Sequence, residues 1–379
     1  MKVCILTTSY PRVDGEGTSV FVRNYVQALA KLVDEVFVVV PHSGGTEPAL
    51  EIRENVTIYR FQYGLFGKGK LAFGAGILAN VKKNPLLIFQ TPLLVTQMIR
   101  TAVPLSQKVD VYHSQWLLSG IAGAVIGFIT KRLHMLTVRG SDMKLISNSF
   151  GRYVSKTIGK LSFAVTAVSK EFVNDLEKKC GVPSHKVHFI PNGISLSSLN
   201  VNDARQFAES LRINGPYLFF SGALTPRKRV ERLLDLVAHL PDHALVLCGN
   251  VSEDRYVTML RDKMNALGIG NRVHILGDRT HEEALHLMKG ASLYVTASDF
   301  EGRPNSVLEA IRAGVPILAS NIPAHRELLP TECLSDKHSP SEVAAQAKRV
   351  CASRPSVTAS RTWDECARDY FDLMVKAKN

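Results

Sequence analysis

The chain has 379 residues, too many for one ordinary hydrophobic core, so two domains are expected. Apolar residues make up 45% and charged residues 21%, a balance that excludes a disordered or fibrous chain. The formal net charge of +12 favours anionic partners, and nucleotides, nucleic acid and anionic membrane surfaces all qualify.

In the first half of the chain, short apolar runs alternate with longer amphipathic segments. The expected strands are 3–8, 35–40, 109–112, 135–138, 163–168 and 187–190. The expected helices are 21–32, 120–132 and 171–180. Because strands that alternate with helices need crossover connections, the pattern predicts a parallel sheet.

A break at Pro191-Asn192-Gly193 and a polar stretch that follows it indicate an interdomain linker. The alternation then starts afresh. The expected strands are 217–220, 244–248, 273–276, 293–296 and 316–319. The expected helices are 229–240, 253–267, 281–289, 305–313 and 363–376. The sequence therefore predicts an α/β protein with two doubly wound parallel-sheet domains.

The six cysteines form no C-x-x-C pair, and none lies at metal-ligand spacing from a histidine. Cys248 lies in an apolar run, which is typical of a reduced core cysteine in a cytosolic protein. The apolar run after Lys2 is too short for a signal peptide, and no uninterrupted run approaches the ~18 residues of a membrane span. We therefore expect a cytoplasmic protein.

The densest polar loop lies between a buried strand and a helix, and it contains Glu301. Asn305 or Ser306 is expected to cap the helix, whose free N–H groups would seat a diphosphate. Glu309 lies about one turn further on, where a carboxylate accepts the two hydroxyls of a ribose. Both acids also fit ordinary helix-terminus roles. Since an unpartnered glutamate among apolar neighbours is costly, a ligand role for Glu309 is favoured.

A second loop follows the strand 217–220, and Gly222 in it allows close approach to the backbone. Arg227, Lys228 and Arg229 then stand at the start of a helix. Cations there oppose the helix dipole, so a bound diphosphate explains them better than helix stability does. The alternative is a solvated basic turn.

These motifs resemble the retaining glycosyltransferases of the GT4 family. The resemblance rests on Gly222-x₅-Lys228, on Glu301-x₇-Glu309 ahead of Gly314-x-Pro316, and on Pro191-Asn192-Gly193-Ile194. Tyr10-Pro11 with the two glycines at 15 and 17, and Ala167-Val168-Ser169-Lys170, also match, so the resemblance covers nearly the whole chain.

The resemblance implies the GT-B fold, in which two Rossmann-like domains face a cleft. Residues 1–197 with a returning helix at 362–379 would form the acceptor-side domain, and residues 198–361 the nucleotide-sugar domain. The implied catalytic residues are Glu301, Lys228 and His113. The implied donor-binding residues are Gly17, Gly222, Arg227, Lys228, Arg303, Asn305, Ser306, Val307 and Glu309.

The sequence departs from the family pattern at three positions. Ala223 stands where the family usually has Arg after the glycine, and Gln115 replaces the second histidine of His-x-His. Arg139 begins a segment, ending at Asp142, where the family has His-Gly-Ser-Asp. We assign Gln115, Arg139 and Asp142 to the acceptor or donor-sugar side, and His113 fits a catalytic role and a hydrogen-bonded core role equally well.

The D-x-D motif, whose two aspartates bind Mn²⁺ or Mg²⁺, does not occur in the sequence. Lys228, its neighbouring arginines and a helix N-terminus are able to neutralise a departing diphosphate without a metal. We therefore expect metal-independent transfer with no cofactor beyond the nucleotide sugar. The family implies retention of configuration and suggests surface polysaccharide synthesis, with UDP favoured over GDP.

The acceptor side is marked by aromatic and basic residues interleaved over 61–85. They are Phe61, Tyr63, Leu65, Phe66, Leu71, Phe73, Lys68, Lys70, Lys82 and Lys83. This mixture favours peripheral contact with an anionic membrane, where a lipid-linked acceptor would be reached, and equally fits a mobile loop over the acceptor site.

Several alternatives remain. A catalytically silent homologue that binds nucleotide sugar or scaffolds an assembly is favoured by Ala223 and Gln115. An epimerase or a phosphorylase on the same fold lacks its own signature here. A dinucleotide dehydrogenase is excluded because no G-x-G-x-x-G follows the first strand. Nucleic-acid binding is not expected, since no recognisable module is present.

Overall fold

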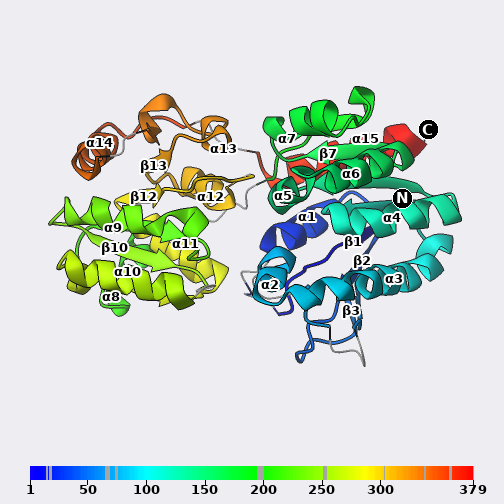
Figure 1. Ribbon diagram of the computed structural model, residues 1–379, viewed down its shortest axis with the longest axis horizontal. Coiled ribbons are helices and arrows are strands. Elements are labelled where there is room, and N and C mark those ends of the chain that lie inside the picture. The colour runs from blue at the N-terminus through cyan, green and yellow to red at the C-terminus, as the bar shows by residue number, and fades with distance from the viewer. Residues whose placement is uncertain are drawn as a thin grey trace. The chain divides into compact units, whose positions relative to one another are not determined.

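The computed structural model describes residues 1–13, 16, 19–64, 69–72, 76–193, 200–250, 254–302, 304–336, 339–357 and 361–378. The chain divides into two compact units (Figure 1). Unit 1 comprises Met1–Gly193 and Arg361–Asn379, and unit 2 comprises Ile194–Ser360. Each unit is a sheet of mainly parallel strands covered by helices on both faces.

Unit 1 is built on a sheet whose described strands lie in the order β3-β4-β2-β1-β5-β6-β7-β8. Neighbouring strands are parallel except β3 and β4, which pair antiparallel at one edge. The strands are β1 (Lys2–Leu6), β2 (Glu35–Pro41), β3 (Leu50–Arg53), β4 (Val56–Phe61), β5 (Val111–Gln115), β6 (Leu133–Val138), β7 (Ala164–Ala167) and β8 (Val187–Phe189).

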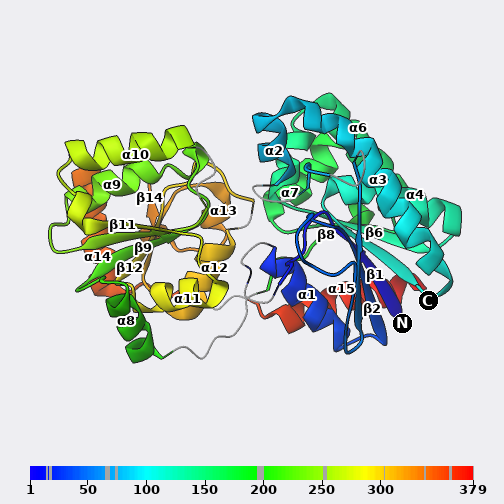
Figure 2. The ribbon, with the colours of Figure 1, turned by 90° about the horizontal axis from the view of Figure 1, so that it is seen from below.

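Two layers of helices cover this sheet (Figure 2). One layer contains α1 (Val20–Ala30) and α15 (Trp363–Lys378), which pack on each other. The opposite layer contains α2 (Ile77–Lys83), α3 (Thr91–Ala102), α4 (Leu117–Thr130), α5 (Met143–Ile146) and α6 (Ser149–Leu161), with the 3₁₀ turns η2 (Pro85–Gln90) and η3 (Val103–Gln107).

Alternate residues of β1 show why both layers form. Val3 and Ile5 belong to the apolar cluster that contains Tyr25 of α1 and Tyr370 of α15, whereas Cys4 and Leu6 belong to the cluster on the other face. Successive side chains of a strand point to opposite faces, so a strand that is apolar throughout needs cover on both sides.

Gly193 ends unit 1's main segment where the chain comes very close to the start of α15. A Cβ at this glycine would lie 2.4 Å from the backbone nitrogen of Trp363. Only glycine fits so close an approach. The predicted linker, from Ser195 to about Asp203, lies outside the described residues as far as 199, and its last residues begin helix α8 at Val201.

Unit 2 has a parallel sheet with the described order β11-β10-β9-β12-β13-β14. Its strands are β9 (Tyr217–Ser221), β10 (Ala244–Cys248), β11 (Val273–Gly277), β12 (Leu293–Thr296), β13 (Ile317–Ser320) and β14 (Leu334–Ser335). Its helices are α8 (Val201–Ser210), α9 (Val230–Ala238), α10 (Asp254–Ala266), α11 (His281–Gly290), α12 (Asn305–Ala313), α13 (Pro323–Arg326) and α14 (Pro340–Ser353).

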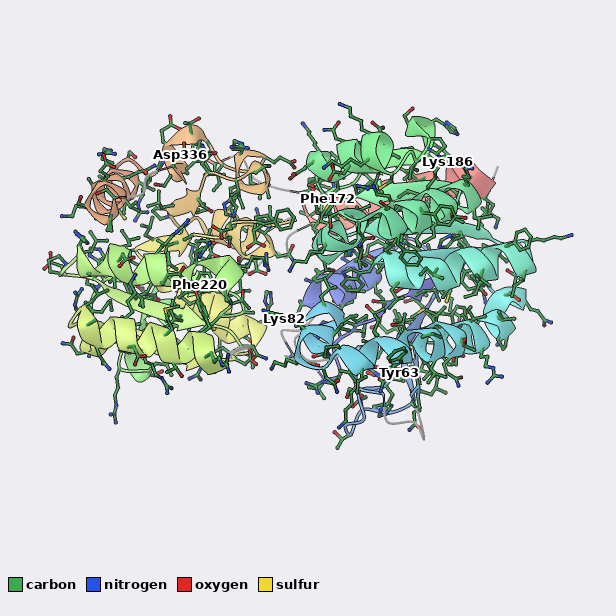
Figure 3. The ribbon with its side chains drawn as sticks, in the orientation of Figure 1. Tyr63, Lys82, Phe172, Lys186, Phe220 and Asp336 are labelled. Carbon is green, nitrogen blue, oxygen red and sulfur yellow. The ribbon has the colours of Figure 1, made fainter. Side chains whose placement is uncertain are left out.

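Several segments differ from the sequence prediction. No helix was predicted where α2, α3, α5, α6, α8, α13 and α14 lie. The predicted helix 171–180 is α7 (Lys170–Asn174) followed by a π-helical turn, Asp175–Lys179. The edge hairpin of β3 and β4 was not anticipated. It places Phe61 in a strand and buries Tyr63 and Leu71 in the core (Figure 3).

Three apolar residues of the segment 61–85 therefore do not belong to the surface that its composition suggested, whereas Lys82 and Lys83 of α2 are exposed. Phe61, Tyr63 and Leu71 are 7%, 2% and 0% exposed, and Tyr63 accepts a hydrogen bond from the Ala72 amide through its hydroxyl. These residues fill the core because the hairpin needs apolar cover on its inner face. The remaining apolar residues named there and Lys68 lie outside the described residues.

Candidate functional site

The strand order of unit 2 reverses between β9 and β12. From β9 the chain runs outward through β10 to β11, and from β12 it runs the other way through β13 to β14. In open parallel sheets, ligands bind beyond the carboxyl ends of the strands at such a reversal. The two loops that carry the predicted donor residues, after β9 and after β12, both begin at this point.

Glu301 brings these two loops together. Lys228 and Arg227 from the loop after β9 donate to its two carboxylate oxygens, with 3.1 Å between Arg227 Nη1 and Oε2. Arg227 also donates to the Phe300 carbonyl at 2.6 Å. Two consecutive cations and a carboxylate that lies 73 residues after Lys228 thus form one cluster.

The electrostatics of Glu301 follow from this contact. Its exposed fraction is 8%, and burial by itself would raise the pKa of the carboxyl. Lys228 and Arg227 outweigh that effect and hold the pKa at about 2. Glu301 is therefore ionised at neutral pH, and it occupies the two cations that an incoming diphosphate would need.

A row of polar groups behind Glu301 positions its carboxylate. Ser298 Oγ donates to Glu301 Oε1 at 2.7 Å, and the Ser298 carbonyl accepts from Ser320 Oγ at 2.6 Å. His325 on α13 is fully buried and lies 2.7 Å from the Ser320 carbonyl through Nδ1. These supporting residues were not predicted from the sequence, although Ser298 follows β12 almost directly.

Arg229 turns away from this cluster. Its backbone is left-handed, with φ of 50°, and its side chain bonds Asp299 and approaches Glu231 at 3.5 Å. Of the two arginines that flank Lys228, it is therefore Arg227 that shares a carboxylate with Lys228.

The start of α12 differs from its prediction. The helix begins directly after Pro304, and no side chain caps it, so Asn305 and Ser306 lie in the first turn instead of at the cap. Proline fixes φ at a helical value and so favours this start. The amide of Val307 already donates to the Pro304 carbonyl at 3.1 Å, which removes it from the expected diphosphate donors.

Two predicted donor-binding residues, Gly17 and Arg303, lie outside the described residues.

Glu309 lies within α12, partly buried, with 26% of its side chain exposed. The Nδ1 atom of His281 lies 3.9 Å from Glu309 Oε1. Burial raises the pKa of the Glu309 carboxyl to about 7. Among the described contacts no Lys or Arg offsets this effect, which is the opposite of the situation at Glu301.

Two glycines allow the backbone segments that follow β9 and β10 to approach each other closely. Gly222 has φ of 148° and donates to the Cys248 carbonyl at 2.9 Å. A Cβ at Gly249 would lie 2.2 Å from the Gly222 carbonyl oxygen. Side chains at either position would strain the backbone or separate the ends of β9 and β10. The site thus depends on these two backbone positions as well as on its charges.

In unit 1 the corresponding reversal of strand order lies between β1 and β5. His113 of β5 is completely buried there, 2.8 Å from the Tyr25 hydroxyl through Nδ1 and 2.7 Å from Thr137 Oγ1 through Nε2. Burial, with Arg139 nearby, holds the pKa of His113 well below its usual range. Because buried partners occupy both ring nitrogens, His113 is a core histidine, which corrects its assignment to catalysis.

Gln115 and Arg139 form a second network at the ends of β5 and β6. Arg139 is 4% exposed, and it donates to Gln115 Oε1 at 2.8 Å through Nε and to Asn192 Oδ1 at 2.9 Å through Nη1. Its guanidinium carbon lies 4.6 Å from the centre of the Phe21 ring and 5.8 Å from that of Trp116. Neutral amides and aromatic rings thus hold this cation, and sequence reasoning missed Asn192, which it assigned to the linker.

The Asp142 carboxylate accepts hydrogen bonds from two backbone amides at the ends of β5 and β6. It accepts from the Arg139 amide at 2.9 Å and from the Leu117 amide, at the start of α4, at 3.2 Å. Burial raises the pKa of its carboxyl to about 7. Trp116 in this turn has φ of 71°, a conformation that costs roughly 1–3 kcal/mol outside glycine and marks strain at this end of the sheet.

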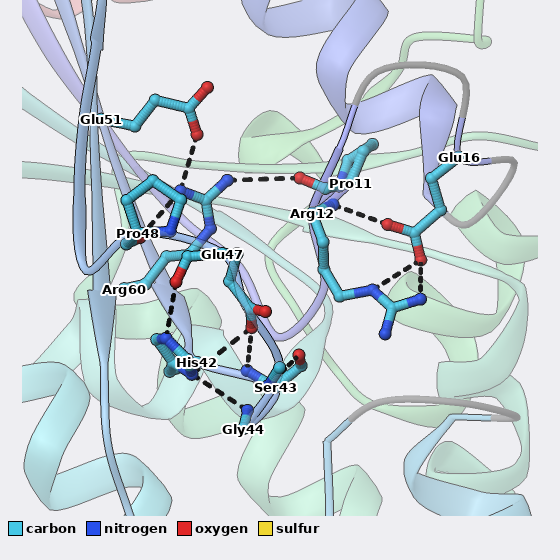
Figure 4. Close-up of polar contacts among 11 residues, drawn as sticks. Pro11, Arg12, Glu16, His42, Ser43, Gly44, Glu47, Pro48, Glu51 and Arg60 are labelled. Atoms are coloured by element: carbon cyan, nitrogen blue, oxygen red, sulfur yellow. Dashed lines mark hydrogen bonds and ion pairs between the residues drawn. The ribbon is translucent and has the colours of Figure 1, made fainter.

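A cavity of about 540 Å³ lies in unit 1 between α1 and the β3–β4 hairpin. Its basic lining residues are Arg12, Arg23, Lys31, Arg53 and Arg60. Arg60 is almost completely buried, contacts Glu51 at 2.7 Å and donates to the carbonyls of Pro48 and Pro11 (Figure 4). Arg12 is paired with Glu16 as well. Since these cations already have internal partners, we assign no ligand to the cavity.

Among the described residues, no group of three or more His, Cys, Asp or Glu side chains is placed to hold a metal ion. All six cysteines are free thiols, and five of them are buried.

Comparison with known proteins matches the two halves of the chain to two family models. Residues 15–198 match "Glycosyltransferase Family 4", and residues 202–361 match "Glycosyl transferases group 1". The chain belongs to these glycosyltransferases. The assignment agrees with the site, since the second match covers the Lys228–Glu301 cluster and α12.

Similar proteins include two bacterial enzymes. The putative teichuronic acid biosynthesis glycosyltransferase TuaC of Bacillus subtilis is 25% identical over 85% of this chain and 81% of its own length. The N,N'-diacetylbacillosaminyl-diphospho-undecaprenol alpha-1,3-N-acetylgalactosaminyltransferase of Campylobacter jejuni is 23% identical over 78% of this chain and 75% of its own.

The fold also agrees with a solved structure. The crystal structure of Anabaena Alr3699/HepE in complex with UDP and glucose superposes with a TM-score of 0.71 at 19% identity, covering 99% of this chain and 96% of that one. The predicted GT-B architecture of two Rossmann-like units is thereby confirmed. The family matches confirm that the chain is a transferase.

Proposed function

We propose that this glycosyltransferase moves a hexose or N-acetylhexosamine from a UDP-sugar to a glycan or lipid-linked acceptor in surface polysaccharide synthesis, with retention of configuration and without a metal. The observation that carries the proposal is the Lys228–Arg227–Glu301 cluster at the strand reversal of unit 2. The choice of UDP is supported by the UDP complex of the structural neighbour. The acceptor class is supported by the diphospho-undecaprenol acceptor in the name of the Campylobacter relative.

In the proposed reaction, Lys228 and Arg227 exchange Glu301 for the diphosphate of the donor. The two cations and the uncapped start of α12 then neutralise the charge that develops on the leaving diphosphate. Glu301, released from the cations, accepts hydroxyls of the transferred sugar. Glu309 accepts the ribose hydroxyls in its ionised form.

Retention is proposed to proceed by attack of the acceptor on the face from which the diphosphate leaves. In this proposal Glu301 binds hydroxyls of the transferred sugar and forms no covalent bond to it. Proton NMR of the freshly formed product tests this step. An inverted anomeric signal would contradict it.

The experiment that tests the donor site is calorimetric titration of the purified chain with UDP and GDP in the presence of a chelator. We expect UDP to bind more tightly than GDP, and we expect chelation to leave both binding and turnover of UDP-sugars unchanged. Turnover that needs added Mn²⁺ or Mg²⁺ would contradict metal independence, but it would not contradict the proposed UDP site.

A catalytically silent protein is the second candidate, because Gln115 and Arg139 hold each other where the family pattern has histidines. The same titration followed by a screen of UDP-sugars separates the two. UDP binding without transfer or hydrolysis of any UDP-sugar would favour the silent protein. The reduced state of all six cysteines supports a cytoplasmic location for either function.

A further inference from the structure

The positive charge of the chain is concentrated in one part of unit 1. Residues 55–170 contain fifteen Lys and Arg residues and two acids, Asp110 and Asp142, for a net charge of +13. The rest of the chain carries 31 Lys and Arg residues against 32 Asp and Glu residues, a net charge of −1. The overall charge of +12 is therefore a property of this segment and not of the whole molecule.

The helices of this segment form a single layer. Helices α2, α3, α4 and α6 lie together on one side of the sheet, opposite α1 and α15 (Figure 2). We call the outer surface of α2, η2, α3, α4 and α6 the basic face. None of these elements contains an Asp or a Glu. Its exposed cations are Lys82, Lys83, Arg100, Lys156 and Lys160, with Lys131 and Arg132 just after α4.

The same face exposes large apolar side chains. Phe89, Phe128 and Phe150, from three different elements, are 74%, 74% and 76% exposed. Further exposed members are Leu86, Ile88, Leu93, Val125, Ile129, Tyr153 and Leu161. The spacing is helical: Phe128 and Ile129 follow Val125 by three and four residues. The protein core therefore does not account for these side chains.

The opposite layer of unit 1 differs in both respects. No residue of α1 or α15 is among the exposed large apolar side chains, and α15 contains four acids: Asp364, Glu365, Asp369 and Asp372. The two layers cover the same sheet and serve the same core. The contrast between them consequently reflects what lies outside each layer.

We propose that the basic face docks this protein on the surface of an anionic lipid bilayer. Phenylalanines in an amphipathic surface insert into the boundary between headgroups and acyl chains, and lysines and arginines beside them attract anionic headgroups. The lack of acids on the face removes the repulsion that such a surface would meet. The proposal deepens the proposed function, since it brings the enzyme to lipid-linked acceptors.

A second copy of the chain is a less suitable occupant. Two-fold pairing places the same patch against itself, so the cations of the basic face would meet each other. An anionic bilayer satisfies both the apolar and the basic side chains at once.

Docking on the surface is distinct from crossing the membrane. The described residues contain one helical stretch, Pro85–Gln107, that is long and apolar enough to span a bilayer by length and composition. Its inner side belongs to the core, however: Leu94, Met98 and Ala102 are at most 1% exposed, and the Tyr112 hydroxyl donates to the Ala102 carbonyl. The stretch is therefore a covering element of the sheet that presents only its outer side.

The test is sedimentation of the full chain with vesicles of phosphatidylcholine alone and of phosphatidylcholine with phosphatidylglycerol. We expect binding to the anionic vesicles that weakens as salt rises, and little binding to the neutral ones. Phe89→Ser with Phe128→Ser is expected to reduce binding at least tenfold. Lys82→Gln with Lys83→Gln (Lys82 is labelled in Figure 3) is expected to reduce it about tenfold and to flatten the salt dependence.

The matched control lies on α10 of unit 2, where Met259 is 38% exposed and Arg255 and Arg261 are exposed. Met259→Ser with Arg255→Gln and Arg261→Gln should leave vesicle binding unchanged. Equal loss in this control, or no binding to anionic vesicles at low salt, would overturn the proposal. A dimer in light scattering that the phenylalanine variants dissociate, without vesicle binding, would also overturn it. UDP binding is measured on the same samples, so a failed donor site would be recognised separately.

Discussion

The polar centres of the two units hold their cations in opposite ways. In unit 2, Lys228 and Arg227 are bound by a carboxylate, Glu301, whose pKa they lower to about 2. In unit 1, Arg139 is bound by the neutral amides of Gln115 and Asn192 and by aromatic rings. A carboxylate partner is exchangeable for an incoming anion, whereas buried amides and rings form a permanent lining. We therefore expect ligand exchange at the cluster in unit 2 and a structural role for Arg139.

Lys228→Ala is expected to give the largest effect. Loss of one cation aimed at the leaving diphosphate should lower kcat/KM for the UDP-sugar by about 10²–10³-fold, because the developing charge loses its neutralising partner. Steady-state kinetics measure this. Arg229→Ala is the matched control, since Arg229 bonds Asp299 instead of Glu301. A similar loss in both variants would mean that overall charge, and not the cluster, governs the rate.

Arg139→Met should instead affect stability. The substitution leaves the carbonyl oxygens of Gln115 and Asn192 buried without their donor, and we expect the free energy of unfolding to fall by about 3 kcal/mol. Chemical denaturation measures this change, and calorimetry should show UDP affinity within about twofold of the wild type. Unchanged stability together with lost activity would contradict a structural role and would indicate that Arg139 contacts the substrate.

Glu309 should make nucleotide binding depend on pH. Its pKa of about 7 means that much of it is protonated below neutrality, and only the ionised form accepts both ribose hydroxyls. The apparent affinity for UDP should rise about tenfold from pH 6 to pH 8 as the ionised fraction rises. Calorimetry over this range measures the slope. Glu309→Gln controls for the titration of UDP itself. If UDP affinity depends equally on pH in that variant, Glu309 is not the group that titrates.

Gly222→Ala is expected to have the smallest effect. The strained backbone at φ of 148° should cost about 1 kcal/mol of stability, and the new methyl group would lie 3.5 Å from Lys228 Nζ. Thermal unfolding measures the first consequence and UDP titration the second. Gly249→Ala, whose methyl group would clash with the Gly222 carbonyl at 2.2 Å, should destabilise more. The reverse order would show that the loop adjusts freely.

The sequence by itself determined the α/β class and most elements of unit 2. Strands 244–248 and 293–296 and helix 305–313 coincide with β10, β12 and α12. Buried parallel strands are continuous apolar runs bounded by turn residues, and this pattern is local. The two loops proposed to bind the donor were singled out for the same reason, since charged residues directly after such strands have no role in the core.

Tertiary structure decided which of these residues meet. His113 and Gln115 are two residues apart in β5, and their Nε2 atoms lie 3.1 Å apart. Tyr25 and Thr137 contact the ring nitrogens of His113, whereas the side-chain oxygen of Gln115 accepts from Arg139. Phe61 and Phe89 look alike in sequence, yet one is in the core and the other is 74% exposed. Burial and hydrogen-bond partners depend on contacts between distant segments, so composition could suggest an aromatic and basic surface but could not place it.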